Sequence, residues 1–306
     1  MEILPRFYEY LHQQGRSPLT IKGYRTDLKL FSQWFEQTNG ETFLPPAVTP
    51  TDIREYRQYM LMVKRYKAST INRRLVAISV FMAWAKHTGQ VEHSPSETVR
   101  SVAQVDSGPR YLDKKEQYAL QRVIEKDLQI SQLRYPKRWR TRRRDASMVL
   151  FLLNTGLRLS EMVALKLADI EILERKGSVQ VLGKGNKQRI VPLNKVARQA
   201  VQDWLAMRST ENGNDDLWLA VEHHSGDRLS GRSVQRVLGR LGEAAKIDKL
   251  TPHMLRHTFA KNLEDQGIGL EKVAALLGHA SLNTTRIYVK PNQKDLEAAV
   301  EGLAVE

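Results

Sequence analysis

Seven side chains suited to phosphate chemistry stand at predicted turns and helix ends in the second half of the chain. They are two arginines, one lysine, three histidines and one tyrosine, namely Arg158, Arg256, Lys184, His253, His257, His279 and Tyr288. Two guanidinium groups can clamp the nonbridging oxygens of a phosphodiester, where charge accumulates during phosphoryl transfer. A tyrosine hydroxyl can attack the phosphorus, and a lysine ammonium can protonate the leaving oxygen. The set therefore predicts phosphoryl transfer from a phosphodiester, with no metal and no other cofactor.

Taken one at a time, these residues are less specific. An arginine at a helix junction is most often structural, and a single tyrosine in a helix usually belongs to the core or its rim. His253 and His257 lie four residues apart, but a zinc site needs at least a third ligand. Met254 also replaces the glutamate of the H-E-x-x-H protease motif. The prediction rests on the combination.

The predicted helices place Arg158 at a junction. An apolar helix over 146–153 ends at Gly156, and an amphipathic helix over 160–167 begins directly afterwards. Free N–H groups and the dipole at a helix N-terminus favour anions, which adds to the charge of Arg158. Glu161 lies three residues further on and can orient the guanidinium.

Lys184 lies in the one segment of the chain whose sequence clearly predicts β-structure. Two β-prone runs, 178–182 and 188–193, flank a glycine-rich turn over 183–187, which predicts a hairpin with the lysine at its tip. The turn lacks the G-x-x-x-x-G-K-[ST] spacing and does not precede a helix, so a P-loop ATPase is excluded.

Two further helices are predicted to carry the remaining residues. The dipeptide 251–252, Thr-Pro, is typical of a helix start, and on this helix His253 and Arg256 share a face. Gly278 closes the next helix just before His279.

The first hundred residues predict a compact unit of four to five helices. Ser17-Pro18 and Thr49-Pro50 are helix starts, Gly40 ends the first long helix, and a third long segment opens at Ser69. A polar, serine-rich stretch over 92–109 marks a boundary. We therefore expect a helical DNA-binding domain over 1–105 and a catalytic domain over 106–306.

Composition limits the classes of partner. The 306 residues carry 48 Lys+Arg against 34 Asp+Glu, a net charge of +14, and contain no cysteine. The surplus points to a polyanion, with nucleic acid the first candidate and an anionic membrane surface the second. The absence of cysteine excludes disulfides, thiolate metal sites and a thiol nucleophile, and fits a reducing cytoplasm. With neither a secretory signal nor a membrane-spanning stretch in the sequence, we expect a cytoplasmic, nucleoid-associated protein.

The segment 134–144 is unusually basic, with seven basic residues and no acid. It is predicted to be a loop inserted between the first two helices of the catalytic domain. It either contacts DNA phosphates or forms a solvated surface. The candidates for phosphate contact within it are Arg138, Arg140, Arg142, Arg143 and Arg144.

Five motifs, in order, resemble the tyrosine recombinases, or phage-integrase-type site-specific recombinases. They are TGLRLSE at 155–161, GKGNK at 183–187, HMLRH at 253–257, LLGH at 276–279 and Tyr288. The segment SPLTIKGYRTDLKLF at 17–31 looks like the helical core-binding domain of the same family. The resemblance covers almost the whole chain. It implies a C-shaped DNA clamp, with a SAM-like helical domain and a mixed α/β catalytic domain.

The resemblance also implies a role for each matching residue. Arg158 and Arg256 would bind the scissile phosphate, and Tyr288 would form a 3′-phosphotyrosine and release a 5′-hydroxyl. Lys184 would protonate that oxygen, and His253 would act as general base or hydrogen-bond donor. His279, the last member of the catalytic set, would support the phosphate and the tyrosine. Glu161 would orient the first arginine, and His257 is a further supporting residue.

The implied partner is double-stranded DNA with specific recombination sites. The implied assembly is a homotetramer with a dimer on each site, exchanging strands through a Holliday junction, with accessory DNA-bending proteins as a further class of partner. The amphipathic tail over 292–306 is expected to dock on a neighbouring protomer, or else to pack on its own domain. The basic insertion favours a mobile-element or phage enzyme over the chromosome-resolution subgroup.

Which residues read the DNA sequence is less defined. The candidates lie on the third N-terminal helix and on a helix that starts near Ser230, and each set could instead hold backbone phosphates. They are Asn72, Arg73 and Arg74 in the first helix, and Arg232, Gln235 and Arg236 in the second. Two alternatives stay open, a catalytically silent DNA-binding relative and a type IB topoisomerase-like enzyme. The complete residue set disfavours the first, and the N-terminal helical domain disfavours the second.

Overall fold

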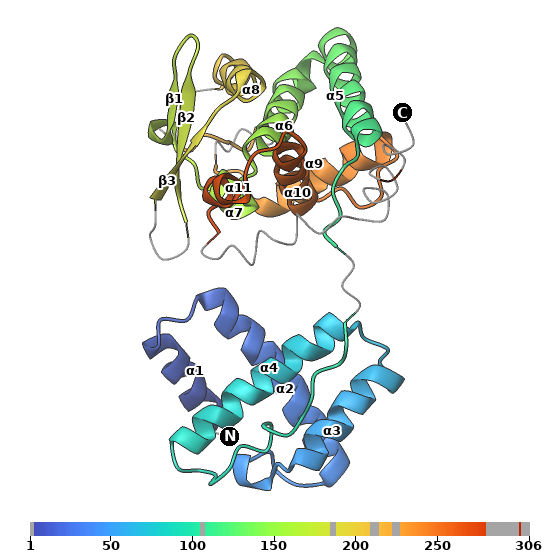
Figure 1. The fold of residues 1–306 in the computed structure, drawn as a ribbon, viewed down its shortest axis with the longest axis vertical. Helices are drawn as coiled ribbons and strands as arrows, with labels where there is room; N and C mark the ends of the chain where they lie inside the picture. The colour runs from blue at the N-terminus through green and yellow to red at the C-terminus, as the bar shows by residue number, and fades with distance from the viewer. Residues whose placement is uncertain are drawn as a thin grey trace. The chain divides into compact units, whose positions relative to one another are not determined.

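The computed structural model describes residues 3–104, 108–183, 188–208, 214–221, 227–279 and 300 of the chain. The chain divides into two compact units, residues 1–106 and 107–306. Helices dominate both units, and one small sheet lies in the second (Figure 1). The predicted fold class, mainly helical with a small β-sheet, is confirmed. Among the described helices, none combines the length and apolar character that a membrane crossing requires.

The described part of the first unit holds four α-helices, α1 (Ile3–Gln13), α2 (Pro18–Asn39), α3 (Pro50–Gln58) and α4 (Ala68–His87). A 3₁₀ turn (Pro45–Ala47) precedes α3, and a π-helical turn (Tyr59–Val63) extends it. The local signals act as predicted. Ser17 accepts the N–H of Thr20 at the start of α2, and Gly40 ends this helix in the left-handed conformation at φ 72°. The third long helix begins at Ala68, one residue before its predicted start.

Aromatic side chains fill the interior of the first unit. Phe81 contacts the rings of Phe7, Phe43 and Trp84 at centroid distances of 5.2, 5.6 and 5.8 Å. These rings come from α1, α4 and the segment between α2 and α3, so one apolar cluster ties distant parts of the unit together.

The second unit is arranged around a long central helix, α6, which packs against α5, α8 and α10. Its helices are α5 (Lys114–Arg134), α6 (Pro136–Thr155), α7 (Leu159–Val163), α8 (Lys195–Leu205), α9 (Gly231–Ala244), α10 (Pro252–Asp265) and α11 (Leu270–Leu277). Its strands are β1 (Ile170–Ile172), β2 (Gly177–Leu182) and β3 (Gln188–Pro192), and a 3₁₀ turn (Leu167–Asp169) precedes β1.

The three strands form one antiparallel sheet in the order β1-β2-β3, beside α8 in Figure 1. Val179 on β2 lies opposite Ile170 on one side and Val191 on the other. Val179, Val181 and Val191 are buried while their neighbours along the strands are more exposed, which gives the sheet one inner face. The predicted hairpin is present. Strand β1 was not predicted, because three residues are too short to show an alternating pattern.

The prediction of a basic loop over 134–144 is wrong. Only Tyr135 separates α5 from α6, and Pro136 starts the new helix at a position where its missing N–H is not needed. The basic residues therefore form the first turns of α6. Asp127, Asp145 and Asp203 lie within ion-pair distance of arginines in this segment, which offsets the repulsion between its charges. Since there is no inserted loop, the segment gives no reason to favour a mobile-element enzyme.

Candidate active site

Arg158 is the N-cap residue of α7, as its place at a helix junction predicts. The helix is shorter than expected, because α7 ends at Val163 and the 3₁₀ turn is separate. Glu161 accepts the backbone N–H of Arg158 at 2.8 Å and its Nη1 at 2.8 Å. The predicted contact between the two residues is thus present, and the arginine side chain remains 36% exposed. Its guanidinium is fixed in direction and still open to a ligand.

Arg256 lies in α10 and is 4% exposed. Its Nη1 donates to the carbonyl of Gly156 at 2.7 Å, and its Nη2 donates to the carbonyl of Leu277 at 2.8 Å. The first bond requires a close approach of α6 and α10. Gly156 makes this possible, because its φ is 62° and a Cβ there would lie 2.3 Å from Cδ1 of Phe259.

Three arginines from different parts of the sequence meet at the C-terminus of α11. The carbonyl of Leu277 accepts from Arg256 and, at 3.5 Å, from Nη1 of Arg158. The carbonyl of Gly278 accepts from Arg158 at 3.3 Å, and that of Leu276 accepts from Nε of Arg189 at 3.0 Å. The last carbonyls of a helix lack partners within it and carry partial negative charge, so cations are stabilised there. This end of α11 brings Arg158 and Arg256 together.

Arg189 also lies at this site, although the sequence did not predict it. It lies on β3, and its Nη1 and Nη2 donate to the two oxygens of Glu161 at 3.1 and 2.8 Å. Burial would raise the pKa of Glu161, but the hydrogen bonds from Arg189 and Arg158 outweigh it, so the pKa is lowered. The carboxylate is therefore ionised at neutral pH. The only sequence signal was a single polar residue in a strand, which is also common on solvent-facing positions.

His279 follows α11 and lies against Arg256, with Nη2 of the arginine 2.9 Å from its Nε2. Burial and the neighbouring charges of Arg256, Arg158 and Arg189 lower the pKa of His279 to about 4. The ring is therefore neutral at pH 7. Because a guanidinium can only donate, Nε2 accepts, and the proton of the neutral ring lies on Nδ1. Nδ1 is thus a hydrogen-bond donor.

His257 and His253 lie one turn apart on α10, with ring centroids 6.4 Å from each other. His253 is exposed, whereas His257 is partly buried. Burial, followed by the charges of His253 and Arg256, lowers the pKa of His257 to about 4. In the described part of the chain, no group of three or more His, Asp or Glu side chains is arranged to hold a metal ion.

Two predicted catalytic residues, Lys184 and Tyr288, lie outside the described residues, as does the predicted tail helix except for residue 300. The structure thus brings together Arg158, Arg256, Glu161 and His279, and places His253 and His257 on the same helix as Arg256.

The three candidates for DNA contact on α4 make contacts within the first unit. Asn72 donates to the carbonyl of Val102 at 2.9 Å and accepts its N–H at 2.8 Å, which ties the segment after α4 to the helix. Arg73 pairs with the buried Asp27. Arg74 lies 3.7 Å from the same carboxylate and covers the ring of Tyr66 at 4.5 Å. The Arg73 side chain remains half exposed.

The candidates in the basic segment differ from one another. Arg144 is 1% exposed and donates to Asp145 and to the carbonyl of Leu219. It therefore belongs to the core, and it is no longer a candidate for contact with DNA phosphates. Arg143 pairs with Asp203 at 2.8 Å, and Arg140 is half-buried. Arg138 is exposed.

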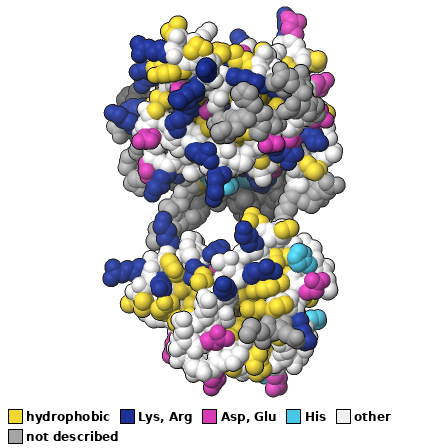
Figure 2. Space-filling model, turned by 180° about the vertical axis from the view of Figure 1, so that it is seen from behind, with side chains coloured by type: hydrophobic (Ala, Val, Ile, Leu, Met, Phe, Trp, Pro, Cys, Tyr) yellow, Lys and Arg dark blue, Asp and Glu magenta, His cyan; other side chains and the backbone are white. Residues whose placement is uncertain are grey.

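On α9, the candidates Arg232, Gln235 and Arg236 are all exposed. On the face seen in Figure 2, Lys and Arg side chains are spread over both units. The net positive charge is therefore a property of the surface as well as of the site.

Two family models match this chain. Residues 124–295 match the model of the phage integrase family, and residues 4–89 match that of the phage integrase N-terminal SAM-like domain. The chain is 33% identical over 284 residues to the tyrosine recombinase XerC of Corynebacterium glutamicum, covering 92% of this chain and 84% of that protein. It is 30% identical over 290 residues to the tyrosine recombinase XerD of Listeria monocytogenes, covering 92% of both.

Solved structures show the same fold. The XerH site-specific recombinase, bound to a difH substrate in a post-cleavage complex, superimposes with a TM-score of 0.77 over 94% of this chain and 80% of that chain, at 23% identity. A lambda integrase dimer on a core site gives 0.70 over 94% of each chain, at 18% identity. With both units matched and the relatives covered over most of their length, the chain belongs to the phage integrase family, the tyrosine recombinases.

Proposed function

We propose that this protein is a site-specific DNA recombinase that cuts and rejoins duplex DNA through a covalent 3′-phosphotyrosine on Tyr288. The observation that carries the proposal is the meeting of Arg158, Arg256 and His279 at the end of α11, where Arg256 is 2.9 Å from His279 and both arginines reach the carbonyl of Leu277. This arrangement is a preorganised anion site, because its donors are fixed before a ligand arrives.

In this mechanism the hydroxyl of Tyr288 attacks the scissile phosphorus, and the bond to the 5′ oxygen breaks. Arg158 and Arg256 stabilise the charge on the nonbridging oxygens. Lys184 gives its proton to the departing 5′ oxygen, and His253 serves as general base or hydrogen-bond donor. His279 contributes a neutral hydrogen bond from Nδ1, since its pKa of about 4 leaves it uncharged at pH 7.

The same chemistry run in reverse rejoins the strands. A 5′-hydroxyl from the partner duplex attacks the phosphotyrosine, the phosphodiester reforms and the tyrosine is released. One phosphodiester is exchanged for another, so no ATP is needed, and the charges of Arg158, Arg256 and Lys184 take the place of a metal ion. Two successive rounds of exchange pass through a Holliday junction.

The similarity to recombinases solved on DNA supports duplex DNA with specific sites as the substrate. We extend the proposal to a homotetramer on two sites, with a dimer on each and the C-terminal tail docked on a neighbouring protomer, and to accessory DNA-bending proteins as partners. A DNA substrate of this kind places the protein at the nucleoid in the cytoplasm.

Covalent trapping tests the proposal. A recognition site is first recovered from a randomised duplex library by binding selection, and is then offered with a nick near the cleavage position, so that the cut strand diffuses away. The wild-type protein should form an SDS-resistant DNA complex. Tyr288→Phe should bind the duplex with the same affinity but form no such complex.

Equal trapping by Tyr288→Phe would contradict the assignment of the nucleophile. Binding without any trapping by the wild-type protein would support the silent DNA-binding alternative instead. Relaxation of supercoiled plasmid in the absence of strand exchange would indicate a type IB topoisomerase.

A further inference from the structure

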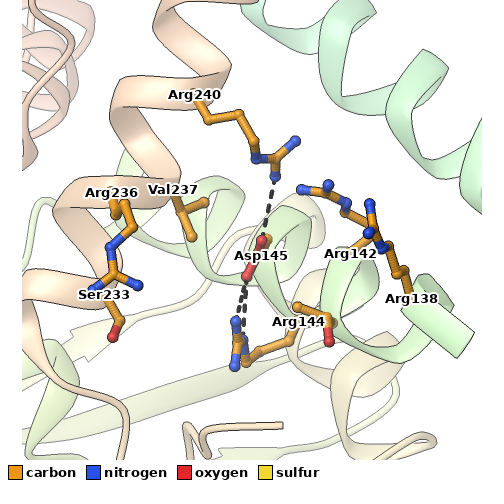
Figure 3. Close-up of a pocket in the computed structure, with 9 residues that line it drawn as sticks. Arg138, Arg142, Arg144, Asp145, Ser233, Arg236, Val237 and Arg240 are labelled. Atoms are coloured by element: carbon orange, nitrogen blue, oxygen red, sulfur yellow. Dashed lines mark hydrogen bonds and ion pairs between the residues drawn. The ribbon is translucent and has the colours of Figure 1, made fainter. Parts of the chain in front are cut away.

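A pocket of about 350 Å³ lies between α6 and α9 and shares no lining residue with the Arg158–Arg256 site (Figure 3). Its lining is dominated by guanidinium groups, with one carboxylate, two hydroxyl residues and a single aliphatic side chain. The arginines are Arg138, Arg142 and Arg144 from α6, and Arg236 and Arg240 from α9. We call this feature the arginine pocket.

The carboxylate of the arginine pocket is already shared between two arginines. Asp145 is buried, and its Oδ1 accepts from Nη2 of Arg144 at 2.7 Å. Its Oδ2 accepts from Nη2 of Arg240 at 3.2 Å, and both pairs are drawn as dashed lines in Figure 3. Arg240 also reaches Asp127, at 3.0 Å. These bonds fix Arg144 and Arg240 in place, and the acids have little capacity left for the other guanidinium groups.

The remaining arginines have few acidic partners among the described residues. Arg142 is 3.8 Å from Asp127, a long contact to a carboxylate that Arg240 already occupies. Arg138 and Arg236 take part in none of the ion pairs formed among the described residues. Figure 3 shows these two side chains coming from opposite sides, Arg236 from α9 and Arg138 from α6. Among the described residues, the five arginines of the pocket pair with two carboxylates, Asp145 and Asp127, which is a surplus of three positive charges within the described part of the chain.

Like charges held around one concavity repel each other, and a bound anion removes that cost. Guanidinium groups present planar pairs of donors that match the oxygens of phosphate, and Thr141 and Ser233 add hydroxyl groups to the lining. Three excess charges correspond to a ligand with more than one phosphate. We propose that the arginine pocket binds a phosphate-bearing anion with two adjacent phosphate groups, held between Arg138 and Arg236.

Such a pair of phosphates has two sources, a free condensed phosphate or neighbouring phosphates of a DNA backbone. The second source rests on the proposed DNA-binding function, whereas the first does not. Isothermal titration with inorganic pyrophosphate at constant ionic strength tests the first, using the full-length protein. The pocket variant is Arg138→Gln combined with Arg236→Gln, two exposed positions. The control is Arg122→Gln, an exposed arginine on α5 outside the pocket lining.

If the ligand is a free phosphate compound, the wild-type protein and Arg122→Gln should each bind one pyrophosphate with the same Kd. The pocket variant should bind pyrophosphate at least tenfold more weakly, because it has lost hydrogen bonds to a charged group. If the source is DNA, pyrophosphate binds weakly to all three. The dependence of duplex affinity on salt then falls by up to about 1.8 logarithmic units in the pocket variant relative to Arg122→Gln, since each phosphate contact contributes about 0.9.

The proposal is overturned if the pocket variant matches Arg122→Gln in both measurements. Thermal unfolding of each variant checks that the fold is intact. The covalent trapping assay tests the recombinase function independently. If the wild-type protein traps DNA and the pocket variant binds pyrophosphate and duplex DNA as Arg122→Gln does, the proposal for the arginine pocket is rejected. The proposed recombinase function is then unaffected.

Discussion

Arg189 on β3 donates to both oxygens of Glu161, the carboxylate that also holds Arg158. Strand β3 is therefore linked through one buried acid to Arg158, the arginine proposed to bind the scissile phosphate. Arg189 also donates to the carbonyl of Leu276, next to the carbonyl that Arg256 uses. Arg189 thus contacts both the acid that holds Arg158 and the helix end that holds Arg256, and we expect it to position these two arginines.

Replacing Arg189 by glutamine should slow DNA cleavage. Glu161 would lose one of its two arginine partners and Arg158 would be less well fixed, and small misplacements of reacting groups cost up to about a hundredfold in rate. The measurement is the single-turnover rate of covalent complex formation, compared with duplex affinity, which should change little. Arg189→Lys should recover only part of the rate, because an ammonium cannot bind both carboxylate oxygens in the same plane.

The control for this prediction is Arg175→Gln, an exposed arginine between β1 and β2. It should keep the wild-type cleavage rate. A wild-type rate in Arg189→Gln would show that the link between the hairpin and Arg158 has no role in positioning.

Gly156→Ala should destabilise the second unit by about 3 kcal/mol. A left-handed backbone costs a non-glycine residue roughly 1 kcal/mol, and the new Cβ at 2.3 Å from Phe259 adds an overpacking cost of about 1–3 kcal/mol. Gly267→Ala is the matched control, since its φ is 74° and no atom lies within 4 Å of the added Cβ. Urea unfolding should show a loss of only about 1 kcal/mol there. Equal losses in the two variants would mean that Phe259 moves aside without cost.

Asp145→Asn should be strongly destabilising. It breaks the ion pairs of this carboxylate with Arg144, which is 1% exposed, and with Arg240, and breaking a buried ion pair by removing one partner costs about 3–5 kcal/mol. Asp203→Asn removes the partner of Arg143, but both of those side chains are partly solvated, so the loss should be about 1 kcal/mol or less. Urea unfolding at neutral pH compares the two. Similar losses of unfolding free energy in Asp145→Asn and Asp203→Asn would contradict the prediction.

Stability should fall as the pH falls from 6.5 toward 4. In the folded protein the pKa values of His257 and His279 are lowered from 6.5 to about 4, so the unfolded chain binds more protons within this window. The stabilisation is complete above pH 6.5 and is lost as the pH approaches 4. Urea unfolding at pH 7.5, 6.5 and 5.5 measures the slope, which should be smaller in His257→Gln. An NMR titration in which both rings gain a proton near pH 6.5 would contradict the prediction.

The sequence by itself determined the helical character of the fold, the helix ends and the short-range contacts at Arg158. These features depend on short-range rules. Ser17 and Thr49 cap helices because their side chains satisfy nearby N–H groups, and Gly156 and Gly278 end helices because only glycine adopts the left-handed conformation cheaply. The contact of Glu161 with Arg158 spans three residues, so spacing alone predicted it.

The tertiary structure decided which charges face solvent and which face each other. The spacing of residues 134–144 could not show that Arg144 points into the core, because its partner Leu219 is 75 residues away. The role of Arg189 was hidden for the same reason, since Glu161 and Leu276 reach it only after the sheet and α11 have packed. The lowered pKa values of His257 and His279 likewise arise from burial and from neighbouring arginines. Long-range packing sets the environment of an ionisable group, and this environment cannot be predicted from the residues next to the group in the sequence.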